Sequence, residues 1–113
     1  MSFSTHVLDA SLGCPASAVT LVLRVAGSSG WQVLAHGVTD ADGRYRFSDR
    51  GGTDALPAGI YRVEFDTGSY FSESGQVGFY PGVSVTFAIT DPAAHHHVPL
   101  LLSPFAYSTY RGS

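Results

Sequence analysis

The 113-residue sequence predicts an all-β sandwich, and three observations favour this class. Short runs of alternating apolar and polar residues recur along the chain, and this period of two is typical of half-buried strands. Glycine, proline, aspartate and serine separate the runs, as they do at turns. No stretch has the 3.6-residue period of a long amphipathic helix. Counting both ends of the chain, we expect about eight strands.

The predicted elements follow one another closely along the chain. Between the strands at the two ends, alternation predicts strands near residues 19–25, 31–36, 45–47, 61–66 and 83–89. Asp42-Gly43 is a turn signal, so Arg44 should begin a strand. A single short helix is expected near residues 69–76, between Gly68 and Pro81. Because repeats, low-complexity tracts and linkers are absent from the sequence, residues 1–113 are expected to form a single domain.

Composition narrows the classes of partner. Apolar residues make up 44% of the chain and charged residues only 13%, which favours a surface partly covered by another subunit. The net charge is −3, and the chain has six arginines and no lysine, so we expect no nucleic-acid partner and no anionic membrane partner. The arginines are Arg24, Arg44, Arg46, Arg50, Arg62 and Arg111.

Cysteine usage and the N-terminal residues bear on the compartment. Cys14 is the only cysteine, so an internal disulfide is impossible and a reducing compartment is favoured. The sequence shows neither a signal peptide nor an apolar membrane span. The expected location is therefore cytoplasmic.

The last residues have the pattern of a docked strand rather than of a frayed end. Phe105, Tyr107 and Thr109 alternate with Ala106, Ser108 and Tyr110. A paired strand would hold the final residues, Tyr110 to Ser113, in a fixed place. The expectation is unusual because chain ends are commonly poorly ordered.

The histidines and Arg44 are the candidate catalytic residues. Period two places His95 and His97 on one face of a strand and His96 on the other, while His6 lies in the first strand. A neutral imidazole is a suitable general base near pH 7. Arg44, at the end of a sheet, has the donor geometry for a planar anion or a developing oxyanion. These are the groups needed to hydrolyse a small anionic cyclic amide with water.

Plainer interpretations of the same residues stay open at this stage. His6 could be a satisfied, partly buried side chain, the His95–His97 run could be a solvated loop end, and Arg44 could be a surface residue after a turn. His6, His95 and His97 could also bind Zn²⁺, although the zinc would be adventitious and no carboxylate clearly supports such a site. We expect no cofactor.

Several motifs resemble the transthyretin family, and in particular its branch of 5-hydroxyisourate hydrolases. The resemblance covers almost the whole chain. It rests on residues 4–9 (STHVLD), 13–16 (GCPA), 39–44 (TDADGR), 59–63 (GIYRV), 95–104 (HHHVPLLLSP) and 107–113 (YSTYRGS). The middle motifs occur in many related sandwiches and support the fold alone. The two C-terminal motifs are highly specific, and the hormone-carrier branch of the family lacks the Tyr-Arg-Gly-Ser ending.

The resemblance implies a set of active-site residues. His6, Arg44, His97 and Ser113 would be catalytic, with Tyr110 contacting the substrate and His95 nearby. The family usually has Tyr where this chain has His96, and often Arg where it has Cys14. Since His96 should face away from His95 and His97, we expect little effect on the chemistry.

The resemblance also implies the fold, assembly and reaction. The fold would be a transthyretin-like sandwich of two four-stranded sheets, assembled as a homotetramer (a dimer of dimers) with active sites at the ends of a central channel. The reaction would hydrolyse 5-hydroxyisourate to 2-oxo-4-hydroxy-4-carboxy-5-ureidoimidazoline in urate breakdown. The alternative is a small-molecule binding protein without catalysis, although such a protein would need no basic groups.

Overall fold

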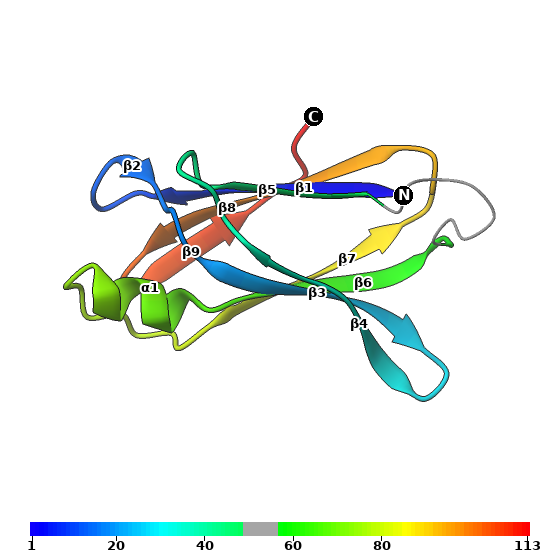
Figure 1. Ribbon diagram of the computed structural model, residues 1–113, viewed down its shortest axis with the longest axis horizontal. Coiled ribbons are helices and arrows are strands. Elements are labelled where there is room, and N and C mark those ends of the chain that lie inside the picture. The colour runs from blue at the N-terminus through cyan, green and yellow to red at the C-terminus, as the bar shows by residue number, and fades with distance from the viewer. Residues whose placement is uncertain (49–56) are drawn as a thin grey trace.

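Two β-sheets face each other across an apolar core, and one short helix lies at an end of the sandwich (Figure 1). The computed structural model describes residues 1–48 and 57–113, so Arg50 lies outside the described residues. The first sheet contains β5 (Arg44–Ser48), β1 (Ser2–Asp9), β8 (His95–Ser103), β9 (Ala106–Thr109) and the two-residue β2 (Cys14–Pro15). The second has the order β4 (Gly30–Val38), β3 (Thr20–Gly27), β6 (Gly59–Phe65) and β7 (Val83–Ile89).

The all-β sandwich is confirmed, with one addition to the predicted pattern. Four longer strands make each sheet, and β2 extends the first sheet by pairing Pro15 with Leu8 and Cys14 with Asp9. Alternation could not have indicated a two-residue strand. The chain reverses before it at Gly13, whose φ of 70° suits glycine.

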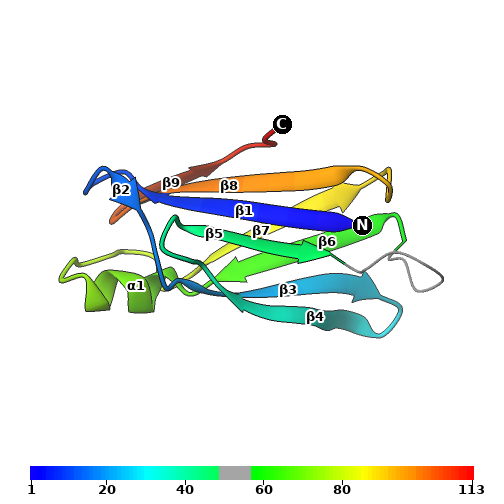
Figure 2. The same ribbon diagram turned by 45° about the horizontal axis from the view of Figure 1, so that its top comes forward.

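Strand β1 is central to the first sheet and has the clearest alternation. It pairs antiparallel with β5 and parallel with β8, and Figure 2 shows the three strands side by side. Phe3, Thr5 and Val7 are fully buried toward the second sheet, whereas Ser4 and His6 lie on the outer face. The Thr5 hydroxyl donates a hydrogen bond to the Val98 carbonyl at 2.7 Å, so this buried polar group is satisfied.

The core joins aromatic and aliphatic side chains from both sheets. Phe3 stacks against Phe87 with ring centroids 5.6 Å apart, and Phe87 lies 6.1 Å from Tyr61 of the same sheet. Leu100 and Leu102 of β8 add fully buried side chains. Each such side chain contributes about 2 kcal/mol to folding through burial. This packing makes the first sheet a rigid support for the groups on its outer face.

The short helix α1 (Thr67–Glu73) begins and ends slightly earlier than the predicted 69–76. Its start is set by Asp66, whose carboxylate accepts a hydrogen bond from the Ser69 N–H at 3.2 Å. The helix ends at Glu73, and its C-cap Ser74 is followed by Gly75 with a φ of 74°. Within residues 1–48 and 57–113, no helix combines the length and the apolar character needed to cross a membrane.

Candidate functional site

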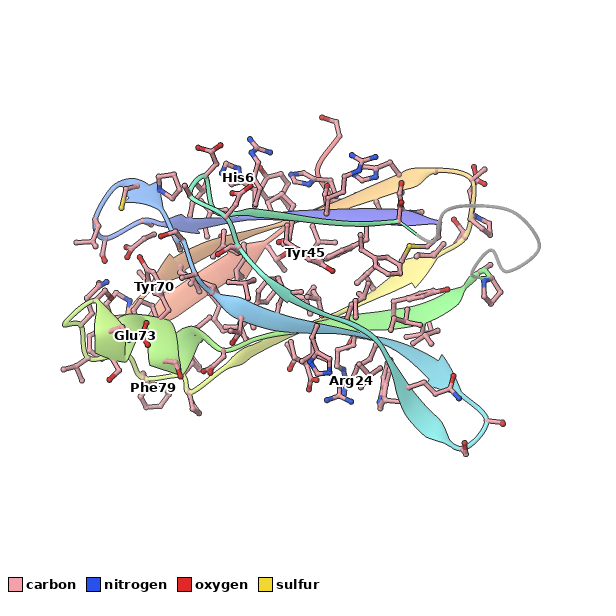
Figure 3. The ribbon with its side chains drawn as sticks, in the orientation of Figure 1. His6, Arg24, Tyr45, Tyr70, Glu73 and Phe79 are labelled. Atoms are coloured by element: carbon pink, nitrogen blue, oxygen red, sulfur yellow. The ribbon has the colours of Figure 1, made fainter. Side chains whose placement is uncertain are left out.

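Strands β5, β1 and β8 bring the candidate residues together on the outer face of the first sheet. His6 lies opposite Arg44 of β5, and Ser4 lies between Arg46 of β5 and His97 of β8. Figure 3 shows His6 on this face, on the same side of the sheet as the C-terminal residues in Figure 1. Residues far apart in the sequence thus form one polar surface of imidazole, hydroxyl and guanidinium groups.

The turn before β5 determines that the strand begins at Arg44. The Gly43 N–H donates to the Asp40 carbonyl at 2.9 Å, and an Asp40 carboxylate oxygen accepts from the Arg44 N–H at 2.9 Å. Gly43 has a φ of 76°, and a side chain there would collide with the Val7 carbonyl oxygen. Glycine is therefore required for both its backbone conformation and its close approach to β1. The predicted Asp42-Gly43 turn is confirmed.

The His97 ring is held between β1 and the C-terminal residues. Its Nδ1 lies 2.7 Å from the Ser4 hydroxyl oxygen. The Gly112 N–H donates to the backbone carbonyl of His97 at 2.9 Å. This bond brings Gly112 against the other edge of the ring, where any side chain at Gly112 would collide with the ring carbon Cδ2. Nδ1 and Cδ2 occupy opposite edges of an imidazole, so Nε2 is left at the outer end of the ring. This is the position that a base facing a substrate requires.

The surroundings of His95 and His97 favour the neutral form of each imidazole. Burial lowers the pKa of His97, and the positive charge of Arg44 and the nearby His6 lower it further, whereas a hydrogen bond with the backbone of Ser4 raises it. The pKa of His95 is lowered by burial, then by Arg46 and the neighbouring histidines. A neutral imidazole can accept a proton, whereas an imidazolium cannot.

Two guanidinium groups remain free to bind an anion. The side chains of Arg44 and Arg46 are exposed and form no ion pair or side-chain hydrogen bond with the described part of the chain. They line a hollow of about 500 Å³ along the β5 edge, together with Ser4, Tyr45 and Asp40, whose carboxylate accepts from the backbone N–H groups of the turn. An unpaired guanidinium beside neutral imidazoles favours a small anionic substrate.

The C-terminal residues reach the site by a short isolated bridge. Strand β9 ends at Thr109, so Tyr110 lies just beyond it, and Gly112 then pairs with His97. The docked end predicted from alternation is thus confirmed, although Phe105 belongs to the turn before β9 rather than to the strand. Ser113 is exposed and makes no hydrogen bond to the residues described, so its catalytic role stays a prediction.

Tyr110 borders a small cavity of about 270 Å³ at the edge of the sandwich. His97 and Arg111 line the same cavity, with Val85 and Phe87 of β7 on its apolar side. The Tyr110 side chain is 59% exposed. The structure therefore brings Tyr110 near His97 and leaves its ring free to contact a ligand.

His96 points away from the other two histidines, as period two predicted. It is only 6% exposed and lines the same cavity, and its Nδ1 has no hydrogen-bond partner among the described residues. The site imidazoles on the outer face are His6, His95 and His97. Across residues 1–48 and 57–113, no three His, Cys, Asp or Glu side chains gather as metal ligands, so the zinc alternative lacks geometric support.

Sequence reasoning did not include Ser2 and Arg46 and did not assign a role to Ser4. All three lie on the same outer face by period two, so the signal was present. What alternation could not show was which strands pair, because Ser4 and His97 are 93 positions apart. Their adjacency depends on the parallel pairing of β1 with β8.

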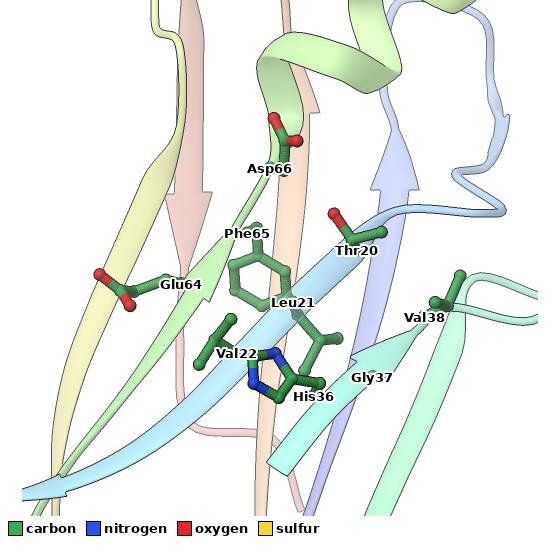
Figure 4. Close-up of a pocket in the computed structure, with 9 residues that line it drawn as sticks. All are labelled: Thr20, Leu21, Val22, His36, Gly37, Val38, Glu64, Phe65 and Asp66. Atoms are coloured by element: carbon green, nitrogen blue, oxygen red, sulfur yellow. The ribbon is translucent and has the colours of Figure 1, made fainter. Parts of the chain in front are cut away.

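A larger hollow, of about 530 Å³, lies on the second sheet and away from these residues (Figure 4). Its polar lining includes His36, Asp66 and Glu64. Glu64 is already paired with Arg24, and the hollow contains no arginine that could hold an anion. Size alone therefore does not locate the site.

Comparisons with known proteins identify the family of the chain. A family model described as the HIUase/Transthyretin family matches residues 3–112. A 5-hydroxyisourate hydrolase of Salmonella dublin is 44% identical over 112 residues, which cover 97% of this chain and 79% of that protein. The solved structure of Klebsiella pneumoniae 5-hydroxyisourate hydrolase is 39% identical, with a TM-score of 0.85 and complete coverage of both chains.

The same fold also occurs in a protein with a different ligand. Sea bream transthyretin in complex with thyroxine is 37% identical, with a TM-score of 0.84 over 97% of this chain and 93% of that chain. Fold similarity alone therefore does not separate a hydrolase from a carrier. The family itself is unambiguous, since its model spans nearly every residue: the chain belongs to the HIUase/transthyretin family.

Proposed function

We propose that this chain is a 5-hydroxyisourate hydrolase, which opens the lactam ring of its substrate to give 2-oxo-4-hydroxy-4-carboxy-5-ureidoimidazoline in urate breakdown. The observation that carries the proposal is the shared outer face of His6, Arg44 and His97. Near full-length similarity to proteins named 5-hydroxyisourate hydrolase supports it. We infer that residues 1–113 act as one domain, which the common core of the two sheets favours.

The mechanism uses water as the nucleophile and a neutral imidazole as the base. His97 Nε2 or His6 accepts a proton from water while the water oxygen attacks the ring carbonyl carbon. Arg44 holds the substrate anion and stabilises the negative charge that develops on the carbonyl oxygen. The carbon–nitrogen bond then breaks, and the proton passes to the departing nitrogen.

The residues near the C-terminus complete the proposed site. Tyr110 would form a wall against the planar substrate, and Ser113 would place its polar groups in the site. His95 would lie beside the substrate, although both of its ring nitrogens already lie within hydrogen-bond distance of Ser4 and Ser2. The mechanism assigns no step to a cofactor or metal.

A homotetramer would bring two subunits to each proposed site. Apolar side chains are exposed near the β9 edge, where Phe79, Phe105 and Tyr110 are each more than half exposed. Tyr107 of β9 packs edge-to-face on Tyr80 at 5.2 Å, so the aromatic surface is continuous with the strand edge. Such a surface favours contact with a second copy. The lone Cys14 favours a cytoplasmic location.

A binding protein without catalysis is the second candidate. The similarity to sea bream transthyretin in complex with thyroxine favours it. Such a carrier would gain nothing from two neutral imidazoles beside an unpaired arginine. Loss of activity on removing an imidazole distinguishes the two candidates.

The test follows the ultraviolet decay of freshly made 5-hydroxyisourate with and without the protein. We expect faster decay with the wild type, and a decrease of about 10²- to 10⁴-fold in turnover for His97→Ala or His6→Ala. His36→Ala is the matched control, because His36 is an exposed histidine on the second sheet. If wild-type protein left the decay at the uncatalysed rate, the proposed function would be wrong. If both variants kept near-native rates, the proposed base would be wrong.

A further inference from the structure

A chain of four side chains runs along the β1–β8 pair on the outer face. The Ser2 hydroxyl lies 2.6 Å from His95 Nδ1, and the Ser4 hydroxyl lies 2.7 Å from His95 Nε2. The same Ser4 hydroxyl lies 2.7 Å from His97 Nδ1. The parallel register explains the chain, because Ser2 is opposite His95 and Ser4 is opposite His97. One hydroxyl therefore connects two imidazole rings.

Counting protons shows that the Ser4 hydroxyl couples the two rings. A serine hydroxyl has one proton to donate and two lone pairs, and a neutral imidazole has one N–H and one bare nitrogen. Ser4 can donate to only one of the two rings. The Ser4 hydroxyl has no other partner in the described part of the chain. For both contacts to be hydrogen bonds, one ring must therefore donate to Ser4 and the other must accept from it.

The two possible directions of the chain give His97 opposite roles. If Ser4 donates to His97 Nδ1, the proton of that ring is on Nε2, which can then only donate. If His97 Nδ1–H donates to Ser4, then Nε2 carries a lone pair. In that second direction Ser4 donates to His95 Nε2, and His95 Nδ1–H donates to Ser2. Only this direction leaves a base at the outer end of the His97 ring.

We propose that Ser4 is a positioning residue that holds the Nδ1–H tautomer of His97, with His95 and Ser2 continuing the same chain of hydrogen bonds. Ser4 then accepts a hydrogen bond from His97 both before and after Nε2 takes a proton. After proton uptake the bond is to a charged ring and becomes stronger. His95 acts through Ser4, since both of its ring nitrogens are engaged.

This inference rests on the proposed function only for the part about catalysis. The tautomer of His97 is a property of the protein without substrate, so it can be measured even if 5-hydroxyisourate is not the substrate. The charged or titratable groups around His97 come from four parts of the chain: His6 of β1, Arg44 and Arg46 of β5, His95 and His96 of its own strand, and Tyr110 and Arg111 near the C-terminus. Variants that leave these groups intact isolate the effect of the hydroxyl.

The first measurement is the imidazole ¹⁵N chemical shifts of ¹⁵N-labelled protein at about pH 8, where the rings are neutral. We expect Nδ1–H and a bare Nε2 for His97 in the wild type and in Ser4→Thr, which retains a hydroxyl. In Ser4→Ala the ring should shift toward the Nε2–H tautomer. An Nε2–H tautomer of His97 in the wild type would overturn the proposal, as would an unchanged tautomer in Ser4→Ala.

The second measurement is activity against pH. Ser4→Ala should lower kcat by about 10- to 100-fold, which is the effect of losing a hydrogen bond to a charged group, with KM nearly unchanged. The acid limb of its pH–rate profile should move to lower pH, because the His97 imidazolium loses the hydrogen bond between its Nδ1–H and the Ser4 hydroxyl. Ser84→Ala, at an exposed serine of β7, is the control.

Ser4→Thr should recover most of the activity. If Ser4→Ala retained the wild-type kcat and pH profile, the proposal would be wrong. If Ser4→Ala does not fold, the wild-type tautomer together with Ser4→Thr still decides it. If the wild type shows the Nδ1–H tautomer but no hydrolysis, the proposed function fails while the hydrogen-bond chain stands.

Discussion

At the scale of single residues, the site combines a base kept neutral with a cation kept free. Burial and Arg44 lower the pKa of His97, and the Arg44 side chain has no partner within residues 1–48 and 57–113. The two effects depend on each other, since an arginine paired with a carboxylate would neither bind an anion nor lower the pKa of the imidazole as strongly. Replacing the guanidinium of Arg44 should therefore affect both substrate binding and catalysis.

Arg44→Lys retains the charge but replaces a planar fork of donors by a single ammonium. We expect kcat/KM to fall by about 10²-fold, as for the loss of one well-placed oxyanion donor. The protein should melt normally, because the side chain is exposed. Steady-state kinetics on 5-hydroxyisourate provide the measurement, with Arg62→Lys on the second sheet as the control. An Arg44→Lys enzyme with wild-type kcat/KM would show that charge alone suffices.

The histidines show what the sequence could predict at this scale and what it could not. Period two correctly placed His95 and His97 on one face of their strand and His96 on the other, and the structure shows that the His96 face is the buried one. It could not identify the partners of the two outer rings, because Ser2 and Ser4 reach them only through a strand pairing that spans more than ninety positions. The roles of Tyr110 and Ser113 depended on the resemblance and stay predictions.

At the scale of elements, one buried carboxylate connects helix α1 to the end of β1. Asp9 is 1% exposed, and burial alone would raise the pKa of its carboxyl. The hydrogen bonds that it accepts lower this pKa to about 2. Their donors are the Tyr70 hydroxyl, the Gln76 amide, the Ser11 hydroxyl and the backbone N–H groups of Ser11 and Leu12.

The depressed pKa of Asp9 predicts acid sensitivity. The unfolded carboxyl has a pKa of about 3.9, so the stabilisation is complete above that pH and is lost as pH falls from about 4 toward 2. It amounts to about 2–3 kcal/mol in the free energy of unfolding. Urea unfolding between about pH 2 and 7 should show this loss in the wild type.

Asp9→Asn should remove that pH dependence and destabilise the protein at neutral pH by about 1–3 kcal/mol. The reason is that Tyr70 and Gln76 both donate to the same carboxylate oxygen, and an amide cannot accept both and satisfy the other donors. Asp91→Asn is the control. Asp91 is exposed, and within the described residues its carboxylate accepts a hydrogen bond only from the Ala93 N–H. An identical acid transition in Asp9→Asn would show that another group is responsible.

Element boundaries depended on details that a periodic pattern does not contain. The helix was predicted in the right segment, but the Asp66 cap starts it two residues earlier than expected. Strand β2 escaped prediction because it is formed by its pairing with β1 and not by its own sequence pattern. The strands with strong alternation, such as β1 and β6, lie where expected because one of their faces is buried.

At the scale of the whole molecule, the sandwich and the C-terminal residues have separable tasks. Leu100 and Leu102 are buried side chains of β8, the strand that pairs with β9, and they hold the sheet to the core. Beyond Thr109, the described contacts are mainly the backbone bridge of Gly112 and the rim of a small cavity. Stability should therefore depend on the sheet, and activity on the residues that follow it.

Deleting Tyr110 to Ser113 tests that separation. The deletion removes exposed side chains and one isolated bridge, so the melting temperature should change little, and the sedimentation mass shows whether the assembly survives. Activity should fall by about 10²-fold or more, because His97 loses the Gly112 contact on one edge of its ring and small misplacements of a catalytic group carry costs of this size. Ser113→Ala, which keeps the bridge, separates the serine hydroxyl from the positioning of His97. A truncated protein with wild-type mass and wild-type turnover would show that the C-terminal residues, although docked against the proposed base, take no part in catalysis.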